Sequence, residues 1–355
     1  MSFDLLIDSL SKRISFHVMR TILHHHNIKV GRNWDGTIEK FKYILDEGSE
    51  EKKDKLIAIL NSVYLEHLIT GDRSVHFFKE DKQTIINIME YFNNYKITES
   101  LFKSNYPYLL DDVALNDTEN NTFLVDVINC EEKQVLIFCS KRFIRERFDI
   151  PPRGDLSEYS EIIGIKRHNK QSFDIIVLHP LTETIEIRVD VGSKVPADDR
   201  KTSFINIKRA FQELVTGFTG TQFILNNVVN LFPVINKLYL SEGEGRVCEL
   251  AFTTDGTSSN KHEKMRQRHE CLRSEAYHKG GFDAVEGRIT AYRIAVTWEH
   301  GTGTSLVTKP ELFLAGSATM LSQEEPILTE AIITDCAGKE DYNFVISKLN
   351  SFLEQ

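Results

Sequence analysis

The stretch FDIIVLHPLTETIEIRVDV, residues 173–191, decides the fold class of this chain. It holds two runs rich in β-branched residues, Phe173–Leu178 and Thr184–Val191, and the second run alternates apolar with polar side chains. Residues 179–182, HPLT, place a proline where a turn belongs. The pattern predicts two antiparallel strands joined by a short connection, and the run Ile162–Lys166 predicts a third strand before them.

Outward from this hairpin, the spacing of apolar residues divides the chain. Residues 1–110 carry them at three- and four-residue steps, which predicts helices, with SVHFF (74–78) as a short edge strand. From residue 111 the period is two, and the predicted strands are joined mostly by hairpins with helices interspersed. We therefore predict an α+β fold with a helical N-terminal region, 1–110, followed by an α+β domain, 111–355. Its sheet is mainly antiparallel, with a subdivision near 218–245.

The individual elements follow from the same periods and from capping residues. Helices are predicted at about 3–22, 37–47, 50–70, 84–95, 201–215, 261–279 and 342–352. The remaining strands are predicted at 122–129, 134–141, 247–253, 289–298, 311–315 and 327–334.

Length and composition predict a globular protein. The 355 residues are 41% hydrophobic and 27% charged, which is ordinary for folded domains. No apolar run reaches the roughly 18 residues of a membrane-spanning helix, and Asp4 and Asp8 stand where a signal peptide is basic or apolar. The five cysteines are widely spaced without a CxxC pair, which favours reduced thiols. We expect a cytoplasmic protein with no membrane contact.

The charge distribution directs any search for a polyanion site to the middle of the chain. The chain has 43 Lys and Arg against 52 Asp and Glu, and a net charge of −9 argues against binding nucleic acid over its whole surface. Residues 161–280 differ, with 17 basic and 15 acidic residues.

Common enzyme motifs are missing from the sequence. There is no GxxxxGK[ST], GxGxxG, HExxH or GxSxG pattern and no kinase or EF-hand signature. Without a glycine loop to hold phosphates, an NTPase or a dinucleotide-dependent enzyme is disfavoured, and we expect no cofactor.

The segment 261–279, KHEKMRQRHECLRSEAYHK, is the most unusual part of the chain. As a helix it would place its apolar residues on one face and basic residues along both flanks, ready to contact phosphates. The predicted nucleic-acid-binding residues are Lys261, Lys264, Arg266, Arg268, Arg273 and Lys279. The alternative is a solvated helix whose long side chains cover apolar neighbours. His262 and His269 share one face of such a helix, but Cys271 and His278 are turned away from it, so we predict no metal site.

The hairpin that decides the fold also carries the candidate catalytic residues Asp174, Glu186, Arg188 and Asp190. Asp174, followed after eleven residues by Glu186-Ile187-Arg188, resembles the D…(D/E)xK pattern of restriction-endonuclease-like nucleases. In that family two acids hold Mg²⁺ and a basic residue orients the attacking water. Arginine stands here in place of the family's lysine and cannot give up its proton. The alternative is a solvated strand face with a Glu–Arg pair.

Three functional hypotheses remain open. The preferred one is a prokaryotic accessory protein, of the kind found in antiviral defence systems, that contacts nucleic acid or another polyanion through the basic segment. Its N-terminal helices would bind a protein partner or a second copy. The second hypothesis is a Mg²⁺-dependent nuclease, whose two carboxylates must lie within roughly 5 Å of each other to share one ion. The third is a protein–protein adaptor without a ligand.

Overall fold

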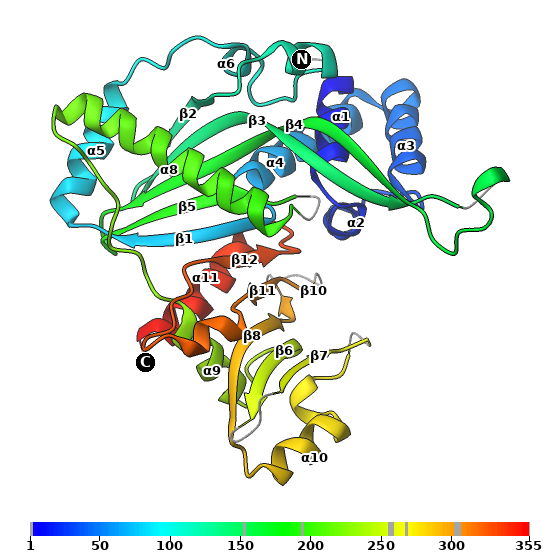
Figure 1. The fold of residues 1–355 in the computed structure, drawn as a ribbon. Coiled ribbons are helices and arrows are strands. Elements are labelled where there is room, and N and C mark those ends of the chain that lie inside the picture. Colours follow the sequence, from blue (N-terminus) through cyan, green and yellow to red (C-terminus); the bar gives the residue numbers. More distant parts are fainter. Residues whose placement is uncertain are drawn as a thin grey trace.

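A computed structural model describes residues 3–151, 154–192, 195–254, 259–266, 269–301 and 307–354. In these ranges the main feature is one sheet in which every strand pairing is antiparallel, in the order β2-β3-β4-β5-β1-β12-β11-β8-β6-β7 (Figure 1). Its strands are β1 (Arg73–Lys79), β2 (Thr122–Asn129), β3 (Gln134–Asp149), β4 (Ile163–His179), β5 (Thr184–Asp190), β6 (Arg246–Thr254), β7 (Asn260–Lys264), β8 (Ile289–Thr297), β11 (Glu311–Leu314) and β12 (Ala331–Thr334). A separate small pair is formed by β9 (His300–Gly301) and β10 (Val307–Thr308). The predicted α+β class is confirmed.

Helices cover both faces of this sheet. They are α1 (Phe3–Arg13), α2 (Phe16–His25), α3 (Trp34–Glu47), α4 (Glu50–Thr70), α5 (Lys82–Asn94), α6 (Leu101–Asn105), α7 (Asp112–Asp117), α8 (Ala197–Thr219), α9 (Phe232–Leu240), α10 (Ala276–Ala284) and α11 (Lys339–Glu354). Short 3₁₀ turns are η1 (Gly154–Leu156), η2 (Leu272–Ser274) and η3 (Ala318–Ser322). Among the described residues, no helix combines the length and the apolar character that crossing a membrane requires.

The core lies in two layers because the central strands are apolar on both sides. Every residue of β5 is buried. On one face, the odd-numbered positions of β4 pack against α1, α2 and α4, and α9 and α11 continue this layer under the other half of the sheet. On the other face, the even-numbered positions of β4 pack against α5 and α8 (Figure 1). The fold-deciding hairpin therefore sits at the centre of the molecule.

Two strand predictions are wrong. SVHFF is not an edge strand, because β1 lies between β5 and β12 and all but its last residue are buried. The runs Ile162–Lys166 and Phe173–Leu178 are one strand, β4, which pairs with β3 over its whole length. The polar residues between the two runs interrupted the sequence pattern, yet their backbones continue the ladder.

Among the helices, the predicted one at 3–22 is two, because Ser15 adopts an extended conformation and caps the N-terminus of α2. Helix α9 was missed. Its sequence FPVINKLYL has only Asn236 and Lys237 as strongly polar residues, and the exposed Leu240 obscures the face formed by Val234, Ile235, Leu238 and Tyr239.

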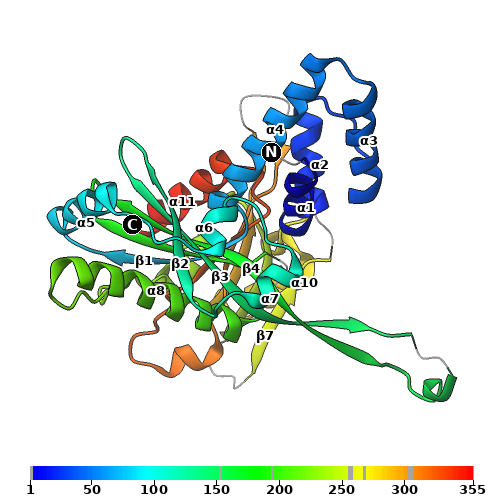
Figure 2. The same ribbon diagram turned by 90° about the horizontal axis from the view of Figure 1, so that it is seen from above.

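The strands β3 and β4 continue far beyond the rest of the sheet, as Figure 2 shows. The ladder of β2 with β3 ends at Ser140, and the ladder of β4 with β5 begins at Ile175. Between these limits β3 and β4 have only each other as partners. We call residues 141–149 and 163–170 the ribbon.

Candidate functional site at the foot of the ribbon

The predicted pair of catalytic carboxylates does not form. Asp174 lies opposite Phe138 in the β3–β4 ladder, whereas Glu186 lies opposite Val177. Because Val177 is three residues from Asp174 and side chains alternate along a strand, Asp174 and Glu186 project from opposite faces of the sheet. They cannot share one Mg²⁺, so the geometry expected for the nuclease hypothesis is wrong at these residues.

Glu186 forms a buried ion pair instead. Its carboxylate lies 2.6 Å from Nη2 of Arg188 and 2.9 Å from Nε2 of His179. Burial alone would raise the pKa of Glu186, but Arg188 and His179 together lower it to about 2. The Arg188 guanidinium also lies 4.3 Å from the ring centre of Tyr342 on α11. The expected Glu–Arg pair exists, but the strand face is buried rather than solvated.

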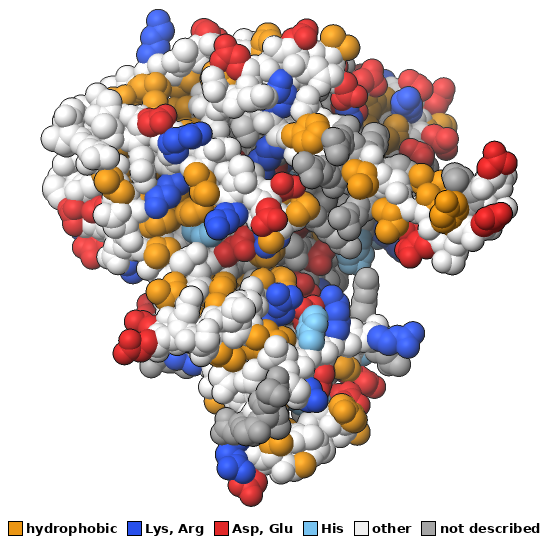
Figure 3. All heavy atoms as spheres, in the orientation of Figure 1, with side chains coloured by type: hydrophobic (Ala, Val, Ile, Leu, Met, Phe, Trp, Pro, Cys, Tyr) orange, Lys and Arg blue, Asp and Glu red, His pale blue; other side chains and the backbone are white. Residues whose placement is uncertain are grey.

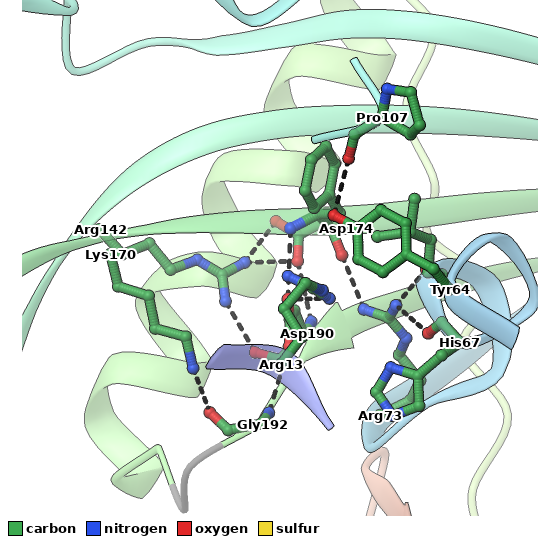
Figure 4. A network of polar contacts seen from close by, with 12 residues as sticks. Arg13, Tyr64, His67, Arg73, Pro107, Arg142, Lys170, Asp174, Asp190 and Gly192 are labelled. Carbon is green, nitrogen blue, oxygen red and sulfur yellow. Dashed lines mark hydrogen bonds and ion pairs between the residues drawn. The ribbon is translucent and has the colours of Figure 1, made fainter. Parts of the chain in front are cut away.

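Asp174 and Asp190 do meet, at the point where the β4–β5 ladder ends (Figure 4). The last backbone pair is Ile175 with Arg188. Beyond it, the amide N–H of Asp190 donates to Oδ1 of Asp174 at 2.9 Å, and the amide N–H of Phe173 donates to Oδ2 of Asp190 at 3.3 Å. A backbone N–H of each strand thus donates to a carboxylate of the other strand. The two strands can therefore separate without leaving these amides unpaired.

Arginines from three different elements surround these two carboxylates. Arg142 of the ribbon donates to both oxygens of Asp174 and, at 2.8 Å, to the backbone carbonyl of Asp190. Arg13, at the end of α1, donates from Nη2 to Oδ2 of Asp190 at 2.8 Å. Arg73 of β1 donates to the carbonyl of Phe173 at 2.6 Å. Figure 4 shows these side chains converging on the end of β5.

This network concentrates buried charge of both signs. Arg13, Arg73 and Arg142, together with Lys170, lie around the carboxylates of Asp174 and Asp190. The nearby Asp72 accepts from the amide of Asp335 at 3.1 Å, and burial first, then Asp335, raises its pKa to about 6. Burial lowers the pKa of Arg73 to about 10. A buried charge without a partner costs free energy, so these arginines depend on the carboxylates beside them.

Arg13 is the arginine of this network that lines a cavity and has unpaired nitrogens. Its side chain is 3% exposed, and its Nε and Nη1 have no hydrogen-bond partner. The guanidinium lies 5.0 Å from the ring centre of Phe173, which satisfies its face but not its N–H groups. Two buried nitrogens of a charged group are therefore unpaired.

A cavity of about 290 Å³ opens beside Arg13 at the foot of the ribbon. Its polar lining comes from Lys12, Arg13, Asp112, His168, Asn169, Lys170 and Gln171. Lys170 also donates to the carbonyl of Gly192 at 2.7 Å. The cavity matches a small anion such as a phosphate group in chemistry, because basic residues outnumber Asp112. The sequence did not indicate this cavity, because Lys12 and Arg13 are far from residues 168–170 along the chain. A sequence shows the charge of these residues but not that they lie together.

The ribbon itself is basic and partly apolar. Seven Lys or Arg stand on its strands against Glu146 and Asp149, namely Lys141, Arg142, Arg145, Arg147, Lys166, Arg167 and Lys170. The register places Arg145 opposite Arg167. Phe143, Ile163 and Ile165 are each more than half exposed. Phe143 lies opposite Asn169, so alternation puts these three residues on one face.

The segment 261–279, predicted to be a basic helix, is a strand, a 3₁₀ turn and the first residues of a helix. Residues 260–264 form β7, because pairing with β6 completes the edge of the sheet and tertiary pairing overrides helix propensity. Alternation along β7 places Lys261 and Lys264 on opposite faces. Lys261, Lys264, Arg266 and Lys279 are exposed, and Arg268 lies outside the described residues. The predicted basic stripe therefore does not form.

Arg273 has a structural role in this segment. Its guanidinium donates to four backbone carbonyls, those of Leu238 at 2.6 Å, Tyr239 at 2.8 Å, Glu244 at 3.2 Å and Gly245 at 3.2 Å. These carbonyls belong to the end of α9 and the loop after it, so Arg273 closes that helix terminus. It is unavailable to phosphates.

A second polar cluster, which sequence reasoning missed, surrounds His278 on α10. Its Nδ1 lies 2.5 Å from Glu263 of β7, and its Nε2 lies 2.9 Å from the hydroxyl of Tyr239 on α9. Burial raises the pKa of Tyr239 to about 12, so this hydroxyl stays protonated. The cluster ties three elements together. Within the described ranges, no group of three or more His, Cys, Asp and Glu is placed to hold a metal ion, and the five cysteines are free thiols.

Comparison with known proteins yields no matching family model and no matching curated sequence. The functional argument therefore rests on the geometry of this chain.

Proposed function

We propose that the protein binds duplex nucleic acid along the ribbon, with one backbone phosphate in the cavity at its foot. The observation that carries this proposal is Arg13, a buried guanidinium beside the cavity whose Nε and Nη1 have no hydrogen-bond partner. A phosphate oxygen accepts charge-assisted hydrogen bonds from guanidinium groups.

The shape and composition of the ribbon support the same proposal. A two-stranded β-ribbon fits a nucleic-acid groove, and the basic residues on both strands would neutralise phosphates on either side. Phe143, Ile163 and Ile165 form an apolar stripe of the kind that wedges between base steps in the minor groove. The tip, residues 150–162, has one arginine against three acids, so the contacts fall on the strands rather than on the tip.

The test is a salt titration of binding to short duplexes of DNA and RNA. If about four phosphates are neutralised, log affinity falls against log salt with a slope of about −3 to −4. Arg145→Ala with Arg167→Ala should weaken binding to all sequences alike and flatten the slope by up to about 2. Lys12→Glu at the mouth of the cavity should also weaken binding. Lys12 is about half exposed and forms an ion pair with the equally exposed Asp8, so the fold should tolerate this change.

The matched control is Lys261→Ala with Arg266→Ala, which removes two exposed cations from the segment that the sequence favoured. Its binding should equal that of the wild type. No binding at about 50 mM salt, or a control as weak as the ribbon variant, would contradict the proposal.

A second candidate function is protein binding by the same ribbon, favoured by the exposure of its apolar stripe. In that case Ile163→Asp with Ile165→Asp should abolish self-association in sedimentation velocity, and the arginine variants should leave it unchanged. A wild-type chain that is monomeric at every concentration would exclude self-association by the ribbon.

A further inference from the structure

A groove of about 630 Å³ lies among the N-terminal helices, between α3 and α4 and beside the segment that follows α2. Its floor is apolar and is formed by Ile28, Ile44, Leu56 and Ile59. Its rim carries the lysines Lys29, Lys40, Lys52 and Lys55. We call these eight residues the lysine groove.

The floor exists because α3 is only partly packed. Of its fourteen residues, Thr37 and Phe41 are buried. Ile44 is half-buried and faces the groove, and Tyr43 beside it is 69% exposed. Exposed apolar surface that is rimmed by polar residues is typical of an interaction site.

The rim is positive and largely unneutralised. Lys40 donates to the backbone carbonyl of Val30 at 2.5 Å. Within the part of the chain that the structure describes, Lys29, Lys52 and Lys55 form no ion pair, and Glu39 is the acid that lines the groove. Lys52 and Lys55 are three residues apart on α4, where like charges repel. An acidic partner would relieve this repulsion.

We propose that the lysine groove binds an acidic amphipathic helix of a partner protein. Such a helix places apolar residues at i, i+3, i+4 and i+7 on one side, which suits the floor, and carboxylates along its flanks, which suit the rim. A nucleic acid would match the lysines but would leave the floor without an apolar partner. The occupant is therefore a peptide with both features.

A second copy of this chain fits less well. Its longest helix, α8, exposes Lys201 and Arg209 beside Asp198 and Glu213, and Figure 3 shows charges of both signs on this side of the molecule, so its flanks are not acidic. Its exposed lysine and arginine would meet the lysines of the rim. The inference goes beyond nucleic-acid binding, because the groove lies on other helices than the ribbon, and it joins the two activities in one chain.

The experiment uses the full chain and a labelled synthetic peptide with leucines at i, i+3, i+4 and i+7 and glutamates elsewhere, followed by fluorescence anisotropy at about 50 mM salt. A second peptide replaces every glutamate by lysine, and a third scrambles the acidic peptide so that its leucines lose the helical period. The acidic amphipathic peptide should bind at least about tenfold more tightly than either. Equal binding of the acidic and basic peptides would overturn the proposal.

Two pairs of variants locate the site. Lys52→Glu with Lys55→Glu should weaken binding of the acidic peptide about tenfold or more. Lys42→Glu with Lys53→Glu reverses two charges outside the groove, one on α3 and one on α4, and should leave binding unchanged. Ile44→Gln should weaken binding through the floor alone. An equal loss in both lysine pairs would show only long-range attraction and would overturn the proposal.

Duplex binding by the groove variants separates this inference from the proposed function. If Lys52→Glu with Lys55→Glu abolishes binding of the duplex rather than of the peptide, the groove is a nucleic-acid site and the inference is wrong. If the duplex binds to neither wild type nor variant while the acidic peptide binds, the proposed function fails and the groove stands.

Discussion

The foot of the ribbon and the segment 261–279 are both rich in Lys and Arg, yet they differ in how those charges are balanced. In the segment, Arg273 is satisfied by four carbonyls and Lys264 by Glu249 at 3.0 Å. At the foot of the ribbon, Arg13 keeps two buried donors unpaired beside a cavity. Basic residues indicate a binding site only where the fold leaves them without hydrogen-bond or ion-pair partners. A sequence does not show which basic residues have such partners.

The largest expected difference between the two regions is the cost of removing one acid. Asp190→Asn leaves Arg13 and its neighbours without their charge partner in the core and should lower the free energy of unfolding by about 3–5 kcal/mol. Glu263→Gln removes one charge-assisted hydrogen bond to His278 and should cost about 1.5–3 kcal/mol. Urea denaturation measures both. Equal losses would mean that the foot of the ribbon is no more strained than the His278 cluster.

A pH titration of stability tests the burial of positive charge at the foot of the ribbon. Burial, with Arg13 and Arg73 nearby, lowers the pKa of His67 to about 3. The unfolded chain binds a proton at this residue near pH 6.5, whereas the folded chain binds it near pH 3, so stability falls as the pH falls through this window. His67 should contribute about 2–3 kcal/mol to the loss from pH 7 to pH 4.5, and His76, whose pKa burial lowers to about 4, adds to it.

The control for this effect is His67→Gln, which cannot titrate. In this variant the free energy of unfolding should fall less steeply between pH 6.5 and pH 3. The lowered pKa of Glu186 acts lower on the scale, because its stabilisation is present above about pH 4.5 and is lost toward pH 2. An acid limb unchanged by His67→Gln would show that His67 is not held neutral by burial.

Within the segment 261–279, stability and binding should be separable. Arg273→Met removes a charged donor from four carbonyls and should cost about 2 kcal/mol, with duplex binding unchanged when folded protein is compared. The exposed Arg266→Met should change stability by less than about 0.5 kcal/mol. Loss of duplex affinity in folded Arg273→Met would return the nucleic-acid site to this segment.

A substitution on the ribbon should have the opposite result, with little effect on stability and a loss of binding. Phe143 is more than half exposed, so Phe143→Ala should change the free energy of unfolding by no more than about 0.5 kcal/mol. It should nevertheless weaken duplex binding, because an apolar wedge is lost. Thermal unfolding and the salt titration together check this. A large loss of stability would mean that Phe143 packs in the core.

The sequence indicated only some of the residues of the candidate site. Asp174 was selected for its spacing to Glu186-Ile187-Arg188, and Asp190 because it shares a strand with Glu186; both lie in the buried network. The pairing of Asp174 with Glu186 was wrong, because a period of two places residues on faces only when the register is known. Arg13 gave no signal, since a lone arginine at a helix end has an ordinary explanation there.

By itself, the sequence determined the α+β class, the hairpin at 173–191 and helices such as α4 and α5, because apolar period, caps and turns are local properties. Only the tertiary structure decided that β1 lies at the centre of the sheet, that β7 is a strand, and that Lys12 and Arg13 meet residues 168–170. These outcomes depend on pairing between distant segments. The free energy of that pairing depends on segments that are distant in the sequence, so a local pattern cannot predict it. It overrides helix and strand propensities, which differ by less than about 1 kcal/mol per residue.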